Sequence, residues 1–100
     1  MKLQEITGIK QKVFEEIRAF AEKRCLHRVV LFGSRARGDY GRASDIDLAV
    51  LGGDILSFTM DMKEETSTLL EFDVVDLGHA LKKEFVDSVQ GEGILLYEKI

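Results

Sequence analysis

Two aspartates separated by one residue are the first chemical signal in this chain. Asp45 and Asp47 lie in the segment DIDLAVL, in which all the remaining residues are apolar. Side chains alternate between the two faces of a β-strand, so both carboxylates are expected on the same side. Two such charges repel, and each raises the pKa of the other unless a cation lies between them. The spacing therefore predicts a divalent cation site, and Mg2+ is the hard ion that takes carboxylate oxygens together with water and substrate phosphates.

A third carboxylate is available in the segment EFDVVDL at residues 71–77. Asp73 and Asp76 would point to opposite faces of a strand, so only one of them can join Asp45 and Asp47. We favour Asp73, because it comes earlier in the strand and directly follows Phe72. Asp76 remains the alternative.

A glycine and a serine, Gly33 and Ser34, follow the apolar run RVVLF at residues 28–32. Glycine at the end of a strand lets the backbone approach a ligand closely, and a short helical turn after it presents N–H groups to phosphate oxygens. The Ser34 side chain adds a hydroxyl. The next eight residues contain three arginines that could balance phosphate charge or face solvent: Arg35, Arg37 and Arg42. The segment thus combines both signs of charge, as an anionic substrate carrying a metal would require.

The rest of the sequence predicts the elements that position these side chains. Apolar residues recur at helical spacing over residues 8–25, and two β-rich runs at 28–32 and 45–51 predict strands. Asp54 is a candidate N-cap for a helix over residues 55–71. A strand over 72–77, a helix over 79–93 and a strand over 94–100 complete the pattern. This order lets helices cover a sheet, so we expect an α+β fold of the α/β sandwich type.

Length and composition limit the classes of protein. The chain has 100 residues with 45% hydrophobic content, which predicts a single domain over residues 1–100. The sequence shows neither a secretory signal nor an apolar run long enough for a membrane span, so we expect a cytoplasmic protein without membrane contact. The net charge of −4 argues against direct nucleic-acid binding. Cys25 is the single cysteine, and it has no partner for an internal disulfide.

The run GSRARGDYGRASDIDL, residues 33–48, resembles the signature of the DNA polymerase β-like nucleotidyltransferase superfamily. The positions that fit the signature are Gly33, Ser34, Ser44, Asp45, Asp47 and Leu48. From the first helix to GEGILLYE at residues 91–98, the chain resembles the minimal nucleotidyltransferases, known as the MNT family. The third carboxylate of that family lies in a strand similar to residues 72–75, which supports the choice of Asp73.

The resemblance implies a nucleotidyltransferase fold with a small mixed sheet, and it implies a reaction. Asp45, Asp47 and Asp73 would be the catalytic residues and would hold two Mg2+ ions, with Asp73 on the acceptor side. Gly33 and Ser34 would hold the β- and γ-phosphates. The nucleotide site would also include Arg35, Arg37 and Ser44. The expected reaction is transfer of a nucleoside monophosphate to an acceptor hydroxyl, with AMP from ATP favoured over another nucleoside triphosphate.

The resemblance also implies a partner. Many minimal members are antitoxins that transfer AMP to a tyrosine of a HEPN-domain protein, often an RNase toxin. A chain of this length is also too short to carry a further domain that would orient an acceptor, which fits a partner that completes the site. The alternative is a binding module with a vestigial metal site that neutralises a helical partner by contact alone. The presence of all three aspartates and of the Gly33–Ser34 pair favours the enzyme.

Overall fold

The structure, a computed structural model, describes residues 3–79 and 82–100, and from the second helix onward the helices and strands alternate. In chain order they are α1 (Leu3–Thr7), α2 (Gln11–Lys23), β1 (Arg28–Phe32), α3 (Ser34–Arg37), β2 (Ile46–Leu51), α4 (Ile55–Glu64), β3 (Phe72–Asp76), α5 (Lys83–Glu92) and β4 (Ile94–Glu98). The expected α+β fold is confirmed. No helix in the described ranges is long and apolar enough to cross a membrane.

The four strands form one mixed sheet in the order β3-β2-β1-β4. Strand β2 runs parallel to β3, whereas β1 is antiparallel to both β2 and β4. In the register of β2 with β3, Ile46 lies beside Phe72 and Asp47 beside Asp73. The two strands that carry the predicted aspartates are therefore neighbours and start at the same end of the sheet.

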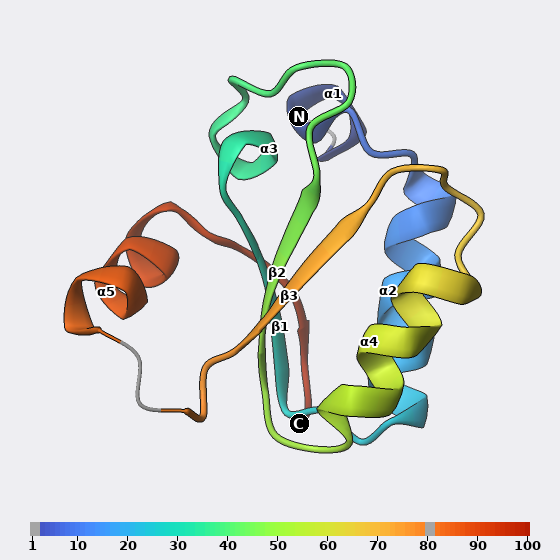
Figure 1. Ribbon diagram of the computed structural model, residues 1–100, viewed down its shortest axis with the longest axis vertical. Coiled ribbons are helices and arrows are strands. Elements are labelled where there is room, and N and C mark those ends of the chain that lie inside the picture. Colours follow the sequence, from blue (N-terminus) through green and yellow to red (C-terminus); the bar gives the residue numbers. More distant parts are fainter. Residues whose placement is uncertain (1–2, 80–81) are drawn as a thin grey trace.

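Helices cover the two faces of the sheet unequally (Figure 1). Helices α2 and α4 lie side by side against one face, and α5 lies on the other, against β1. The α2–α4 face is the hydrophobic core, because alternate residues of each strand point into it. The buried side chains there include Val29, Leu31, Ile46, Leu48, Val50, Phe72 and Leu96 from the sheet, with Phe14, Ile17, Phe58 and Met62 from the helices. The alternation also directs Asp47 to the opposite, α5 face.

The N-terminal helical region differs from the prediction. Residues 8–25 were expected to form one helix, but α2 spans Gln11–Lys23 and a separate short helix, α1, precedes it. Gly8 separates them at a φ of 69°, and a Cβ at this position would overlap the ring of Tyr40. A contact with a residue so distant in the sequence could not be predicted from helical periodicity.

The two later helices are shorter than expected. Helix α4 begins at the predicted cap, because the Asp54 carboxylate accepts the N–H of Ser57 at 3.2 Å, but it ends at Glu64 instead of continuing to residue 71. Thr66 and Ser67 leave the helix with their side chains bonded to Met62 O and to Glu16. The local bond of Thr66 competes with helix continuation, and the bond of Ser67 ties the chain to α2 instead. Helix α5 begins at Lys83, and residues 80–81 of the predicted segment 79–93 lie outside the described residues.

Candidate functional site

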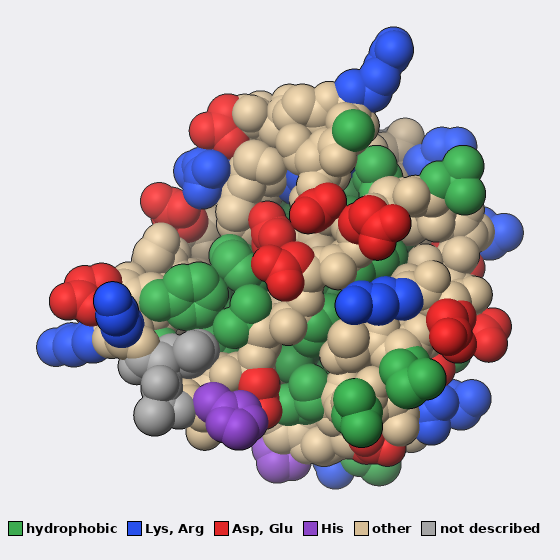
Figure 2. Space-filling view, in the orientation of Figure 1, with side chains coloured by type: hydrophobic (Ala, Val, Ile, Leu, Met, Phe, Trp, Pro, Cys, Tyr) green, Lys and Arg blue, Asp and Glu red, His purple; other side chains and the backbone are tan. Residues whose placement is uncertain are grey.

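The aspartates meet where β2 and β3 begin. Asp47 and Asp73 are direct neighbours in the parallel register, so both side chains emerge on the α5 face. Asp45 immediately precedes β2 and is exposed. Figure 2 shows acidic side chains gathered over this upper end of the sheet. The structure thus brings Asp73, the acid favoured from the sequence, together with Asp47.

Asp76, the alternative third acid, lies at the other end of β3. It pairs with Val50, and its carboxylate accepts the N–H of Gly78 at 2.7 Å. The same carboxylate lies 3.3 Å from the imidazole of His79. Asp76 therefore stabilises the turn that follows β3 and takes no part in the aspartate cluster.

The electrostatics of Asp47 are those of a carboxylate without a cation. Burial raises the pKa of Asp47, and the neighbouring charges of Asp73 and Asp45 raise it further. Arg37 opposes this rise from a distance, and within the described residues Asp47 forms no ion pair. The fold therefore places three negative charges near one another without neutralising them.

The donor chemistry of this cluster fits Mg2+, although no metal cage is already assembled. In the ranges that the structure describes, no three Asp, Glu, His or Cys side chains are arranged to hold a metal ion by themselves. Magnesium does not need a complete protein cage, because it keeps several waters and binds one or two carboxylates together with substrate phosphates. Adjacent carboxylates on an open sheet face meet that requirement. The metal roles of Asp45, Asp47 and Asp73 remain a prediction.

The turn between β1 and α3 lies directly over Asp47. Gly33 adopts a φ of 77°, and a Cβ at this position would overlap the Asp47 carboxylate. Only glycine permits this close approach without strain. Ser34 then begins the predicted short helical turn, α3, and is half-buried. Gly33 and Ser34 are therefore beside the aspartates, where phosphate oxygens would have to lie.

Arg35 occupies a different environment from the one predicted. Its side chain is buried, and its guanidinium donates to the carbonyl oxygens of Ser44 at 3.0 Å and Thr7 at 2.9 Å. The guanidinium also lies over the ring of Tyr40, 4.7 Å from the ring centre. These contacts join α1, α3 and the turn before β2. We therefore leave Arg35 out of the proposed nucleotide site.

Of the remaining predicted residues, Arg37 lies near the aspartates and Ser44 stabilises the turn before them. Arg37 is exposed at the end of α3, where it pairs with Asp39 at 3.2 Å and with Glu92 of α5 at 3.5 Å. Ser44 supports the turn before Asp45, because its hydroxyl accepts the N–H of Gly41 at 2.7 Å. Sequence reasoning missed Glu92, which links α5 to Arg37 of α3. No pattern in the sequence distinguishes Glu92 from other helical acids.

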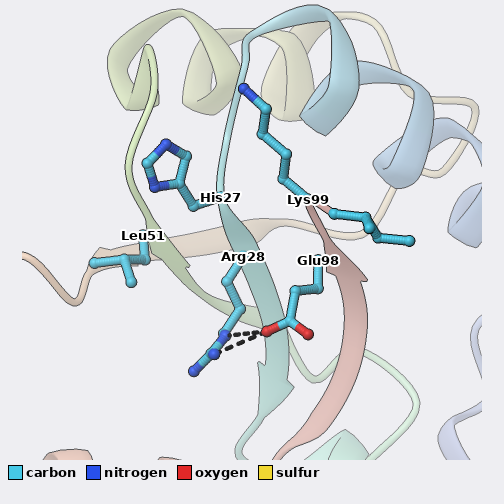
Figure 3. A pocket seen from close by; sticks show the side chains of 6 residues that line it. His27, Arg28, Leu51, Glu98 and Lys99 are labelled. Carbon is cyan, nitrogen blue, oxygen red and sulfur yellow. Dashed lines mark hydrogen bonds and ion pairs between the residues drawn. The ribbon is translucent and has the colours of Figure 1, made fainter.

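Not every hollow of the described structure lies beside the aspartates. One of about 460 Å3 lies at the opposite end of the sheet, beside Arg28 and Glu98 (Figure 3). The guanidinium of Arg28 donates to the Glu98 carboxylate at 3.1 and 2.8 Å, so these charges neutralise each other. That hollow offers no unneutralised acidic cluster, and the aspartate end of β2 and β3 remains the candidate active site.

A small mixed sheet that carries adjacent aspartates beside a glycine–serine turn is the arrangement expected of a nucleotidyltransferase. Residues 15–100 match the family described as "Polymerase beta, Nucleotidyltransferase". The chain therefore belongs to this nucleotidyltransferase family, and the resemblance found in its sequence is confirmed.

Two curated relatives come from Methanocaldococcus jannaschii. The chain is 32% identical over 78 residues to "Putative protein adenylyltransferase MJ0141", covering 69% of this chain and 77% of that protein. It is 40% identical over 50 residues to "Putative protein adenylyltransferase MJ0604", a match that spans 50% of this chain and 48% of that protein. Among solved structures, one described as a toxin-antitoxin with AMP-PNP is 26% identical, with a TM-score of 0.70. That match covers 86% of this chain and 73% of the other.

Proposed function

We propose that this domain transfers AMP from ATP to a hydroxyl of a partner protein. The observation that carries the proposal is the pairing of Asp47 with Asp73 on one sheet face, where the acids form no ion pair within the described residues and where burial and the neighbouring charges raise the pKa of Asp47. A magnesium-bound triphosphate is an economical ligand for such a cluster, because it provides both the cation and phosphate oxygens to coordinate it.

Each residue of the candidate active site has an expected role in this reaction. Asp45, Asp47 and Asp73 would hold Mg2+, which when bound supplies charge neutralisation and lowers the pKa of the acceptor hydroxyl. Gly33 leaves room for phosphate oxygens over Asp47, and Ser34 offers a hydroxyl beside them. Arg37 lies near enough to Asp47 to affect its pKa, and it would balance remaining phosphate charge. Catalysis in this arrangement would consist mainly of positioning and charge stabilisation.

A protein acceptor is supported by the relatives. Both curated relatives are named as protein adenylyltransferases, and one similar solved structure is described as a toxin-antitoxin with AMP-PNP. We infer that the domain acts as an antitoxin. Following the resemblance of its sequence to the MNT family, the acceptor is a tyrosine of a HEPN-type toxin. We propose that the partner itself supplies the positioning of the acceptor hydroxyl beside the aspartates.

Nucleotide binding tests the first half of the proposal. Titration calorimetry should show ATP binding in the presence of Mg2+ and little binding in excess EDTA, since three carboxylates repel an uncomplexed triphosphate. Equal affinity under both conditions would exclude the metal-dependent site.

Transfer tests the second half. The chain should be copurified with its native partner, incubated with ATP and Mg2+, and the partner weighed by mass spectrometry. We expect one or more added AMP groups with the wild type and none with Asp73→Asn. If the Asp45, Asp47 and Asp73 triple variant silences the partner as well as the wild type does, and no mass is added, inhibition is by contact alone.

A further inference from the structure

A groove of about 630 Å3 lies beside the candidate active site but takes no part in it. Its walls are the start of α2, the turn at residues 42–43 and the loop at residues 67–70. In Figure 1 these segments surround the upper end of the sheet, where β2 and β3 begin. We call this feature the basic groove, after three of the side chains that line it: Lys10, Lys12 and Arg42.

The three cations of the basic groove are not neutralised. All three residues are exposed, and none of them forms an ion pair within residues 3–79 and 82–100. The Glu16 carboxylate bonds to Ser67 of the groove, accepting its N–H at 3.0 Å and its hydroxyl at 2.9 Å, and among the described residues it forms no ion pair with these cations. A cluster of cations on a chain with a net charge of −4 indicates an anionic occupant.

The groove also has an apolar component. Ile9 and Val13 are buried below it, and Leu70 is half-buried in its wall. Leu69 is 100% exposed, so its whole side chain is available to an occupant. An occupant that combines carboxylates with apolar side chains matches these surroundings better than a free phosphate does.

The basic groove is joined to the aspartates through the backbone. Arg42 precedes Asp45 by three residues, and Leu70 precedes Asp73 by three residues. The two segments are tied together where the strands begin, because the N–H of Ile46 donates to the carbonyl oxygen of Glu71 at 2.8 Å. A polypeptide held in the groove would therefore have its neighbouring residues beside Asp45 and Asp73.

We propose that the basic groove binds an acidic segment of the protein acceptor, next to the residue that carries the reactive hydroxyl. This inference rests on the proposed function, and it identifies how the acceptor is recognised. The net negative charge of the chain does not prevent such docking, because salt screens charges over about 10 Å at 0.1 M ionic strength and leaves the local cations dominant.

A pair of fluorescent peptides tests the proposal. Each has twelve residues with a central tyrosine and a leucine, and they differ only in that four glutamates in one are glutamines in the other. We expect the wild type to bind the acidic peptide about tenfold more tightly at about 0.1 M ionic strength, with the advantage shrinking as salt rises further. The Lys10→Gln, Lys12→Gln double variant should lose most of this preference. A matched Lys63→Gln, Lys99→Gln variant, which removes two exposed cations elsewhere, should keep it.

Other outcomes would overturn the inference. Equal binding of the two peptides by the wild type, or equal losses in both double variants, would show that the groove does not select acidic segments. Preferential binding of a twelve-nucleotide single-stranded RNA that depends on Lys10 and Lys12 would assign the groove to nucleic acid instead.

Calorimetry with Mg2+ and ATP on the same variants separates this inference from the proposed function. The Lys10, Lys12 double variant should bind the nucleotide as the wild type does. Loss of nucleotide binding in that variant would make the groove part of the nucleotide site. If the wild type binds the acidic peptide selectively but does not bind ATP, the proposed function fails and the groove remains a peptide site.

Discussion

Two aspartates within the same fold, Asp61 of α4 and Asp47 of β2, have opposite surroundings. The Asp61 carboxylate accepts two bonds from Arg24, from Nε at 2.7 Å and from Nη2 at 3.0 Å. The bonds from Arg24 lower the pKa of Asp61. Asp47 has Asp73 as its neighbour on the next strand, and burial together with Asp73 and Asp45 raises its pKa.

The difference separates carboxylates that stabilise the fold from those that await a ligand. A guanidinium bonded at both nitrogens satisfies the Asp61 carboxylate, so the pair fastens α4 to the residue that follows α2. At Asp47 the neighbouring carboxylates add negative charge, which Arg37 opposes only from a distance. We therefore expect a bound cation to supply the remaining positive charge. The same substitution, aspartate to asparagine, should therefore affect mainly activity at Asp47 and mainly stability at Asp61.

The largest contrast is expected in catalysis. We predict that Asp47→Asn lowers AMP transfer by at least about a thousandfold, because a metal ligand is lost. Its Tm without metal should be unchanged or slightly higher, since like-charge repulsion is relieved. Asp61→Asn should retain most transfer and lose roughly 5–10 °C in Tm, because Arg24 loses its charged partner. Melting curves and the partner mass assay measure both. A large loss of Tm in Asp47→Asn would make Asp47 a structural residue.

The turn over Asp47 gives the next largest effect. Gly33→Ala should destabilise the domain by about 1–3 kcal/mol, because alanine is strained at positive φ and its Cβ would meet the Asp47 carboxylate. The displaced carboxylate should also weaken ATP binding by about tenfold or more. Gly91→Ala in α5 is the control, since a Cβ there meets no atom within 4 Å and alanine favours helix. Equal effects of the two changes on nucleotide affinity would contradict the close approach of Gly33.

The position of the aspartate cluster is the part of the site that the sequence predicts best. The period-two alternation of strands predicted that only one of Asp73 and Asp76 could join the pair. The early position of Asp73 in the run and the family resemblance favoured Asp73, and the structure places it beside Asp47. Strand β1 coincides with the predicted run at residues 28–32 for a related reason, since its apolar, β-branched residues are continuous and Gly33 ends them.

The parts that escaped prediction depend on contacts between distant residues. The buried position of Arg35 requires Thr7 and Ser44 to present their carbonyl oxygens, and neither is identifiable from the sequence around Arg35. The end of α4 depends partly on Glu16, which bonds Ser67 from another helix. Local propensity does not contain such tertiary contacts, and for that reason Arg35 was predicted to bind nucleotide together with Arg37.

Arg35 and Arg37 show the same contrast between a residue that stabilises the fold and one that is expected to bind the ligand. Arg35→Met should destabilise the domain by about 2–4 kcal/mol, because two backbone carbonyls lose a charged donor in a buried position. Arg37→Met removes an exposed side chain and should leave the Tm nearly unchanged while weakening the binding of ATP with Mg2+. Urea unfolding and calorimetry distinguish the two outcomes. If Arg35→Met folds normally and loses only nucleotide affinity, the original nucleotide-binding prediction for Arg35 is restored.

The smallest effect is the pH dependence of stability without metal, and its sign differs between the two aspartates. The lowered pKa of Asp61 means that its charged form stabilises the native state above the ordinary aspartate range, near pH 4, and that this contribution is lost as the pH falls through the lowered pKa. The raised pKa of Asp47 means that its charge destabilises the native state above that pKa, and that protonation removes the cost as the pH falls toward the ordinary range. Between pH 7 and pH 3, the stability deficit of Asp61→Asn relative to the wild type should therefore shrink toward zero, and so should the stability advantage of Asp47→Asn. Urea unfolding across this range in EDTA measures both differences. A deficit for Asp47→Asn that shrinks on acidification would mean that its carboxylate is already neutralised within the fold, and the distinction between the two aspartates would be lost.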